Sequence, residues 1–220
     1  MRAVILTAVL PEARAIARAF HLPVPAPGRR AQAPTTPTDA PIALRLVGVG
    51  ARHLDTLTAQ KPHALIMAGL AGALAPDLEV GAVVIQGACK PLPGVHFGTL
   101  ATTAHILATP ADKATLYRQT GALAADMETE PARRLAESMH IPFLAVRAIS
   151  DTASQNLDPA LLDLVDADGK PRLGRVLCYL AARPSQLPEL LRLRRAANRA
   201  LANLTTALRA IIDSGWPDAG

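Results

Sequence analysis

Two acidic motifs in the second half of the chain combine residue types and spacing that suit acid–base chemistry. Asp-Met-Glu-Thr at 126–129 follows one short apolar run, and Ser-Asp at 150–151 ends a second apolar run that begins at Pro142. Each run is typical of a buried strand. The carboxylates of Glu128 and Asp151 would therefore stand at strand ends, where open α/β folds bind their ligands.

The segment between the two motifs, residues 129–140, has a helix-like pattern. A strand–helix–strand unit joins parallel strands, and parallel strands place their carboxyl ends at the same edge of the sheet. We therefore expect Glu128 and Asp151 to converge on one crevice. Two carboxylates in one crevice suit general acid–base catalysis on a small molecule.

Two earlier segments also follow predicted strands and extend the candidate site. Glu12 follows the first strand, and a glycine turn at 69–72, which contains Ala71 and Gly72, follows the third. Glu12 alone is equally a good helix-start residue, because a carboxylate offsets the positive end of the helix dipole. Glycines allow a ligand to approach the backbone closely. The combination with the two acidic motifs favours a functional role for Glu12.

The alternation of strands and helices predicts a three-layer α/β/α fold with a central mixed, mostly parallel sheet in one domain over residues 1–220. A stretch with six prolines at 23–41 is expected to be a loop. Strands are expected over 3–9, 42–49, 64–67, 80–86, 99–103, 121–125 and 142–149, and helices over 12–20, 52–60, 110–119 and 129–140.

The charge distribution argues against a nucleic-acid partner. The net charge is +5, but the segment from Lys170 onward carries nine basic and three acidic residues. The first 169 residues, which hold the candidate site, are therefore nearly neutral. A nucleic-acid-binding domain would carry its basic residues on the functional part of the chain.

Neither metal binding nor secretion is indicated. The cysteines, Cys89 and Cys178, lie in apolar surroundings, and the six histidines are scattered, so no metal site is expected. The apolar start of the chain is too short for a signal peptide, and no run reaches the roughly eighteen apolar residues of a membrane span. We expect a cytoplasmic protein with free thiols.

The end of the chain, at about 184–213, predicts one amphipathic helix with an apolar stripe. Arg192, Arg195 and Arg199 share another side of it. One interpretation is a packing helix with a solvated basic face. The other is a helix that makes peripheral contact with the inner membrane surface, because anionic lipids attract basic residues.

The motifs together resemble the nucleoside phosphorylase/nucleosidase superfamily, which includes purine nucleoside phosphorylases and methylthioadenosine/S-adenosylhomocysteine nucleosidase. The resemblance runs from Val4 to Asp151, and its two specific motifs are those at 126–129 and 142–151. Less specific matches are Glu-Ala at 12–13 and Ala-Gly-Ala-Leu at 71–74.

The tail from Leu177 to Leu193 further resembles the hopanoid-associated branch of this superfamily. That branch is associated with removing adenine from adenosylhopane, a lipid-linked nucleoside. The resemblance therefore implies a small-molecule purine nucleoside as substrate, plausibly with a lipid attached. It also implies a homo-oligomer.

The resemblance implies a role for each acidic residue. Asp151 would deliver a proton to the departing purine, Glu128 would accept hydrogen bonds from the ribose hydroxyls, and Glu12 would polarise the attacking water. Met127 would pack against the ribose. The other implied substrate-binding residues are Ser150, Ala71, Gly72, His105 and Ile106.

The residue types favour water over phosphate as the nucleophile. Phosphorylases resembling this chain place arginine or serine where this chain has Glu12, Met67 and Leu70. A carboxylate repels phosphate and suits the activation of water. Arg14 and Arg52 lie nearby in the sequence, so a phosphorylase with inorganic phosphate as co-substrate stays open. No other cofactor is expected.

Two further functions are alternatives for this sequence. A non-catalytic nucleoside-binding protein would explain why the segment at 90–97 is short for this superfamily. A dinucleotide-dependent oxidoreductase is disfavoured, because the glycines at 48–50 and 69–72 do not complete the dinucleotide-binding fingerprint.

Overall fold

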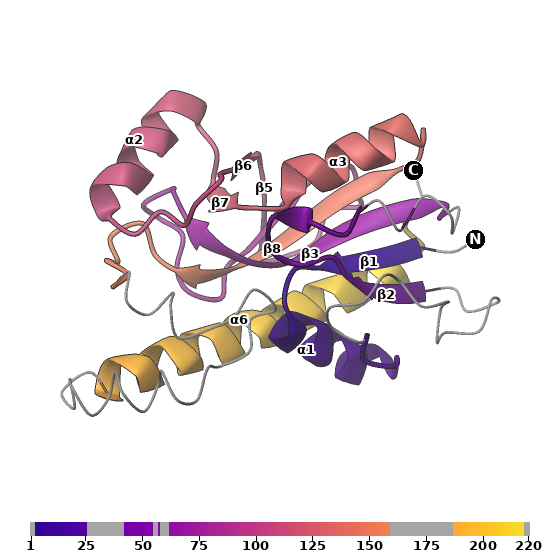
Figure 1. The fold of residues 1–220 in the computed structure, drawn as a ribbon, viewed down its shortest axis with the longest axis horizontal. Coiled ribbons are helices and arrows are strands. Elements are labelled where there is room, and N and C mark those ends of the chain that lie inside the picture. Colours follow the sequence, from indigo (N-terminus) through magenta and orange to yellow (C-terminus); the bar gives the residue numbers. More distant parts are fainter. Residues whose placement is uncertain (1–2, 26–41, 55–56, 58–61, 159–186, 218–220) are drawn as a thin grey trace.

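The structure is a computed structural model that describes residues 3–25, 42–54, 57, 62–158 and 187–217. A mixed sheet lies between two layers of helices (Figure 1), so the expected three-layer α/β/α fold is confirmed. Most of the predicted loop at 23–41 and much of the predicted helix at 52–60 lie outside the described residues.

Eight strands of the described chain form one sheet. The strands are β1 (Ala3–Thr7), β2 (Ile42–Leu46), β3 (Ala64–Ala73), β4 (Val83–Gln86), β5 (Val95–Phe97), β6 (Leu100–Thr102), β7 (Ala124–Asp126) and β8 (Phe143–Asp151). The helices are α1 (Leu10–Phe20), the short 3-10 helix η1 (Val49–Ala51), α2 (Pro110–Thr120), α3 (Thr129–Ser138) and α6 (Leu187–Asp213).

The centre of the sheet is formed by β3 and β8, which pair in parallel from Leu65 to Gly72. Both strands are almost continuously apolar and buried, as expected for strands covered on both faces. The strand order is β2-β1-β3-β8-β4-β5, and β4 runs antiparallel to β8, which makes the sheet mixed.

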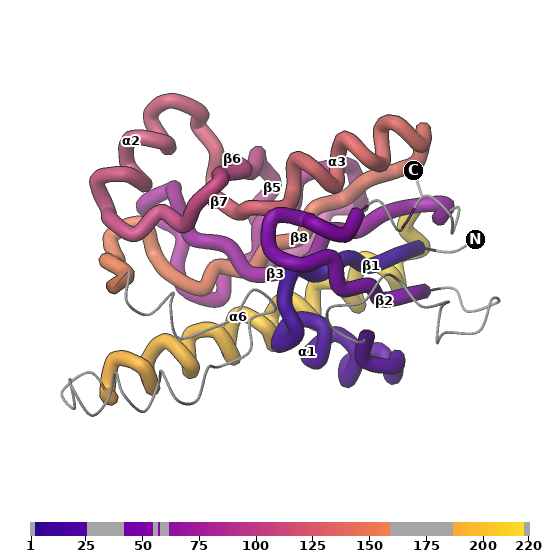
Figure 2. The backbone as a smooth tube through the Cα atoms, in the orientation of Figure 1, coloured from indigo at the N-terminus to yellow at the C-terminus, as the bar shows by residue number. Residues whose placement is uncertain are grey.

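Successive residues of the central strands face opposite helix layers, as the pleat of a strand requires. Ile5 and Ile66 pack in the core with α1 and α6, whereas Leu6 and Met67 pack in the core with α3. Figure 2 shows α1 and α6 on one side of the sheet and α3 on the other.

The predicted C-terminal amphipathic helix is present as α6. Its second half is part of the core, because Leu204, Leu208 and Ile211 are fully buried. Arg192, Arg195 and Arg199 are exposed. Packing against the sheet is thus one role of this helix, and its basic side is exposed, although the side chain of Arg199 also lies close to Gly81.

Two details of the predicted topology are wrong. First, β7 is antiparallel to β3, which is parallel to β8, so the expected parallel unit of β7, α3 and β8 does not exist. Second, residues 69–72 form no turn, because β3 continues through them to Ala73. Hydrophobic runs reveal buried strands but not their direction, and the glycines of β3 serve close packing rather than a turn.

Candidate active site

The site forms where β1 and β7 approach each other along the same edge of β3. β1 pairs with β3 as far as Met67, and β7 pairs with it, in the opposite direction, at Gly72 and Ala73. The carboxyl ends of both strands therefore point at residues 68–71 of β3. This geometry, rather than parallel pairing, brings Glu12 and Glu128 together.

Glu12 lies in the first turn of α1 and is 4% exposed. One carboxylate oxygen accepts the backbone N–H of Leu70 at 2.9 Å, and the other accepts those of Ala8 at 3.1 Å and Val9 at 3.3 Å. Burial raises the pKa of Glu12 to about 7, although nearby Arg147 opposes the shift. Glu12 therefore both caps the helix and is suited to exchange a proton near neutral pH.

Glu128 follows β7 and faces the same edge of β3. Its Oε1 accepts the backbone N–H of Gly50 at 3.0 Å, and its Oε2 lies 3.4 Å from Nη2 of Arg147. Burial raises its pKa, and the charge of Arg147 opposes this. The carboxylate is therefore fixed in position but keeps acceptor capacity for a ligand.

Arg147, in the middle of β8, is a buried cation surrounded by carboxylates. Its Nη2 is paired with Asp126 and Glu128, and Glu12 also stabilises its charge. Its Nε and Nη1 have no hydrogen-bond partner among the described residues. Because buried donors are costly without partners, these two nitrogens are candidates to bind a buried water.

Gly69 leaves the space in which Glu12 and Arg147 approach each other. A Cβ at this position would lie 2.7 Å from Oε1 of Glu12 and closer still to Nη1 of Arg147. The backbone there is ordinary strand, so the glycine is explained by close approach rather than by an unusual φ.

Asp126 holds Arg147 in place. Its side chain accepts a hydrogen bond from Thr102 Oγ1 at 3.0 Å and others from the backbone and hydroxyl of Thr129. Neither Arg147 nor Asp126 was assigned a role from the sequence. The available signal was a charged residue inside the apolar run at 142–149, where an arginine requires carboxylate partners.

Asp151 ends β8 at the far end of the site. Its Oδ1 accepts a hydrogen bond from the hydroxyl of Ser150 at 2.7 Å, and its Oδ2 accepts one from Nζ of Lys113 at 2.6 Å. A Cβ at position 72 would lie 2.9 Å from Oδ2, so Gly72 makes room for this carboxylate. Lys113, on α2, belongs to no motif and was not predicted.

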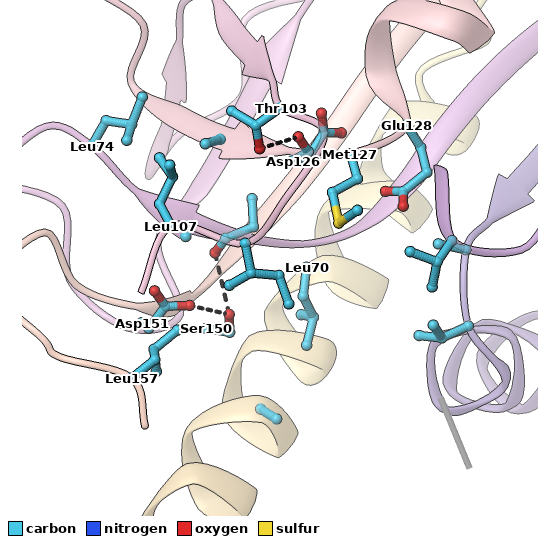
Figure 3. Close-up of a pocket in the computed structure, with 18 of the residues that line it drawn as sticks. Leu70, Leu74, Thr103, Leu107, Asp126, Met127, Glu128, Ser150, Asp151 and Leu157 are labelled. Atoms are coloured by element: carbon cyan, nitrogen blue, oxygen red, sulfur yellow. Dashed lines mark hydrogen bonds between the residues drawn. The ribbon is translucent and has the colours of Figure 1, made fainter. Parts of the chain in front are cut away.

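A cavity of about 510 Å³ joins the two ends. Figure 3 shows Glu128 and Met127 at one end, Ser150 and Asp151 at the other, and Leu70 between them. The predicted residues that line it are Glu12, Ala71, Gly72, Ile106, Met127, Glu128, Ser150 and Asp151.

His105 is the predicted site residue that the structure does not bring to the cavity. It is exposed and absent from the lining, whereas its neighbours Ile106 and Leu107 line the cavity. The assignment of base binding to His105 stays a prediction.

Part of the chain is similar to a known protein family. Residues 86–182 match the family model described as the Phosphorylase superfamily. A search of curated protein sequences finds no significant match. This match confirms the resemblance that the motifs at 126–129 and 142–151 indicated.

Solved structures share the fold over nearly the whole chain. The 5'-methylthioadenosine/S-adenosylhomocysteine nucleosidase of Helicobacter pylori is 13% identical, with a TM-score of 0.65 over 97% of this chain and 98% of that chain. The corresponding nucleosidase of Neisseria meningitidis is 15% identical, with a TM-score of 0.65 over 97% and 99%. Futalosine hydrolase of Helicobacter pylori is 13% identical, with a TM-score of 0.62 over 97% and 98%.

Proposed function

We propose that this chain, which resembles the nucleoside phosphorylase/nucleosidase superfamily in its motifs and its fold, hydrolyses the N-glycosidic bond of purine nucleosides. The observation that carries the proposal is that Glu12, Glu128 and Asp151, far apart in the sequence, line one cavity. The similar structures named as nucleosidases support an adenosine-type substrate.

The end of the cavity at Glu12 is proposed to activate the water. Arg147 is not among the residues that line the cavity, but its charge lies near Glu12 and favours the ionised carboxylate that a general base needs. A Glu12 carboxylate with a pKa of about 7 is matched to removing a proton from that water. Glu128 is then placed to accept hydrogen bonds from the ribose hydroxyls, and Met127 to pack against the sugar.

The end of the cavity at Asp151 is proposed to serve the leaving group. When the C1'–N9 bond breaks, its electron pair goes to the purine, which leaves more readily once a ring nitrogen is protonated. Asp151 is the acidic residue at this end, and Ser150 orients it. The apolar lining of the cavity limits competition from bulk water.

Water is favoured over phosphate by the charges around the cavity. Among the described lining residues, Lys113 is the cation, and it is already paired with Asp151. Arg14 and Arg52, which left a phosphate site open in the sequence, are exposed and do not line the cavity. Among the described lining residues at the Glu12 end, a phosphate would meet carboxylates rather than cations.

The first prediction is that the purified protein releases adenine from adenosine or methylthioadenosine in buffer that contains no phosphate. Added phosphate should leave the rate within about twofold, because Lys113, the cation among the described lining residues, is already paired with Asp151. Liquid chromatography of adenine, ribose and ribose phosphate measures this. Strict phosphate dependence would establish the phosphorylase, and nucleoside binding without any product would establish a binding protein.

The substituent on the ribose is proposed to be apolar, plausibly the lipid of adenosylhopane. Leu157 and, from α6, Leu193 and Ala197 extend the cavity with apolar surface. The basic side of α6 is exposed close to these residues, which places it to contact an anionic membrane surface. Among the described residues, none of the helices is both long and apolar enough to cross a membrane.

The second prediction concerns binding to anionic liposomes. Replacing Arg192, Arg195 and Arg199 by glutamine should weaken co-sedimentation about 100-fold, because each basic residue near such a surface contributes about 1 kcal/mol. These side chains are exposed, so the apolar face of α6 stays intact.

A matched control replaces three other exposed arginines, Arg14, Arg18 and Arg118, which lie on α1 and α2. This control should bind like the unmodified protein. Equal loss in both variants would show a nonspecific charge effect, and no loss in either would remove the membrane contact from the proposal.

A further inference from the structure

A second buried cation, Lys113, lies at the leaving-group end of the cavity. Its side chain is 1% exposed, and its Nζ donates to Oδ2 of Asp151 at 2.6 Å. The same ammonium donates to the backbone carbonyls of Thr152 at 2.8 Å and Gln155 at 3.3 Å. Its three N–H groups are thus all used, and Lys113 can act on a substrate only through Asp151.

Both oxygens of Asp151 accept hydrogen bonds from neighbouring side chains. One oxygen accepts from Lys113 and the other accepts from Ser150. A carboxylate that accepts at both oxygens carries no proton of its own, whereas the adjacent ammonium carries a transferable one. Of the two groups that donate to Asp151, the ammonium of Lys113 is the stronger acid, so it is the source of a proton for a departing purine.

We propose that Lys113 is a positioning residue that supplies, through Asp151, the proton taken by the leaving purine. As the C1'–N9 bond breaks, the proton on Nζ moves to Asp151, and the carboxyl group donates a proton to a purine ring nitrogen. The water oxygen bonds to C1', and its proton goes to Glu12. After the products leave, Glu12 returns a proton to solvent and Lys113 takes one up.

This inference rests on the proposed function. It adds that Lys113 is needed only when the leaving group must be protonated. Adenine must be protonated to leave readily, whereas p-nitrophenolate leaves as a stable anion. A purely structural role for Lys113, as a tie between α2 and the segment after β8, would affect both leaving groups alike. The ratio of the two rates therefore separates proton supply from support of the fold.

The experiment compares cleavage of adenosine and of p-nitrophenyl β-D-ribofuranoside by the unmodified protein, Lys113→Met and Lys113→Arg. Both variants should lose about 100-fold or more in kcat on adenosine, which is the usual effect of removing a proton donor. Arginine keeps the charge but does not release its proton in proteins. Both variants should cleave the nitrophenyl riboside within about threefold of the unmodified rate.

Lys90→Met is the matched control, because Lys90 is exposed and donates to the carbonyl of Ser214 instead. Adenosine cleavage near the unmodified rate in Lys113→Met, retention of that rate in Lys113→Arg, or equal loss on both substrates would each overturn the inference. If Lys113→Met does not fold, Lys113→Arg decides alone. Failure of the unmodified protein to release adenine would instead sink the proposed function.

Discussion

Replacing Asp151 by asparagine should lower kcat for adenine release by about 10³-fold while the fold is kept. A proton donor at the leaving group contributes roughly 10²–10⁴-fold, and an amide cannot replace it. Asparagine has nearly the same shape, so its oxygen can still accept from Lys113, and its position beside Gly72 is retained. Single-turnover measurement of adenine formation isolates the chemical step from product release.

Asp112→Asn is the matched control for this prediction, since Asp112 is exposed in the first turn of α2 and contacts Thr109. It should turn over like the unmodified protein. Circular dichroism and thermal unfolding would show whether Asp151→Asn is folded. A folded Asp151→Asn protein with near-normal turnover would mean that another group protonates the purine.

The sequence was sufficient to predict the strand-end residues of the site. The apolar run of β8 is long and uniform, so Ser150 and Asp151 could be placed at its end without knowing the topology. Glu12 could be placed in the same way after β1. Such placement works because a buried strand has a recognisable pattern and its first polar residues mark where it ends.

The relations between strands could not be predicted in the same way. β7 has only three residues, and its antiparallel pairing at Gly72 and Ala73 depends on contacts distant in the sequence. Glu128 reaches the site all the same, because β7 points back along β3 toward the end of β1. Glu128 and Asp151 therefore line one cavity, as predicted. They do so through an antiparallel β7 and not through the parallel strand pairing that the sequence pattern suggested.

The two buried cations were missed because their partners are distant in the sequence. Lys113 sits on a helix whose other residues are mostly exposed, so nothing local marks it as buried. It lies 38 positions from Asp151, and only the fold pairs them. Arg147 was part of a recognised motif, but its role depends on Asp126, Glu128 and Glu12 surrounding it.

Catalytic efficiency should depend on pH through Glu12. Its pKa of about 7 means that it is mostly protonated below that pH and mostly ionised above it. A general base must be ionised to accept a proton from water, so kcat/KM should rise as the pH increases. Between about pH 6 and pH 8 the ionised fraction rises from about one tenth to about nine tenths, and kcat/KM should follow.

Glu12→Gln should remove this rise together with most of the activity, roughly 10²–10⁴-fold, because glutamine cannot accept the proton from water. Glu130→Gln is the control: Glu130 lies at the surface, and Arg133 and Arg134 hold its pKa down to about 2, so it should not contribute to the rise. Burial also raises the pKa of Glu128, so the Glu12→Gln variant is needed to assign the rise in kcat/KM to Glu12.

Two outcomes would exclude Glu12 as the base. One is a kcat/KM of the unmodified protein that does not change with pH, and the other is an unchanged rise in Glu12→Gln. Glu128, another carboxylate that lines this end of the cavity, would then be the next candidate for activating the water.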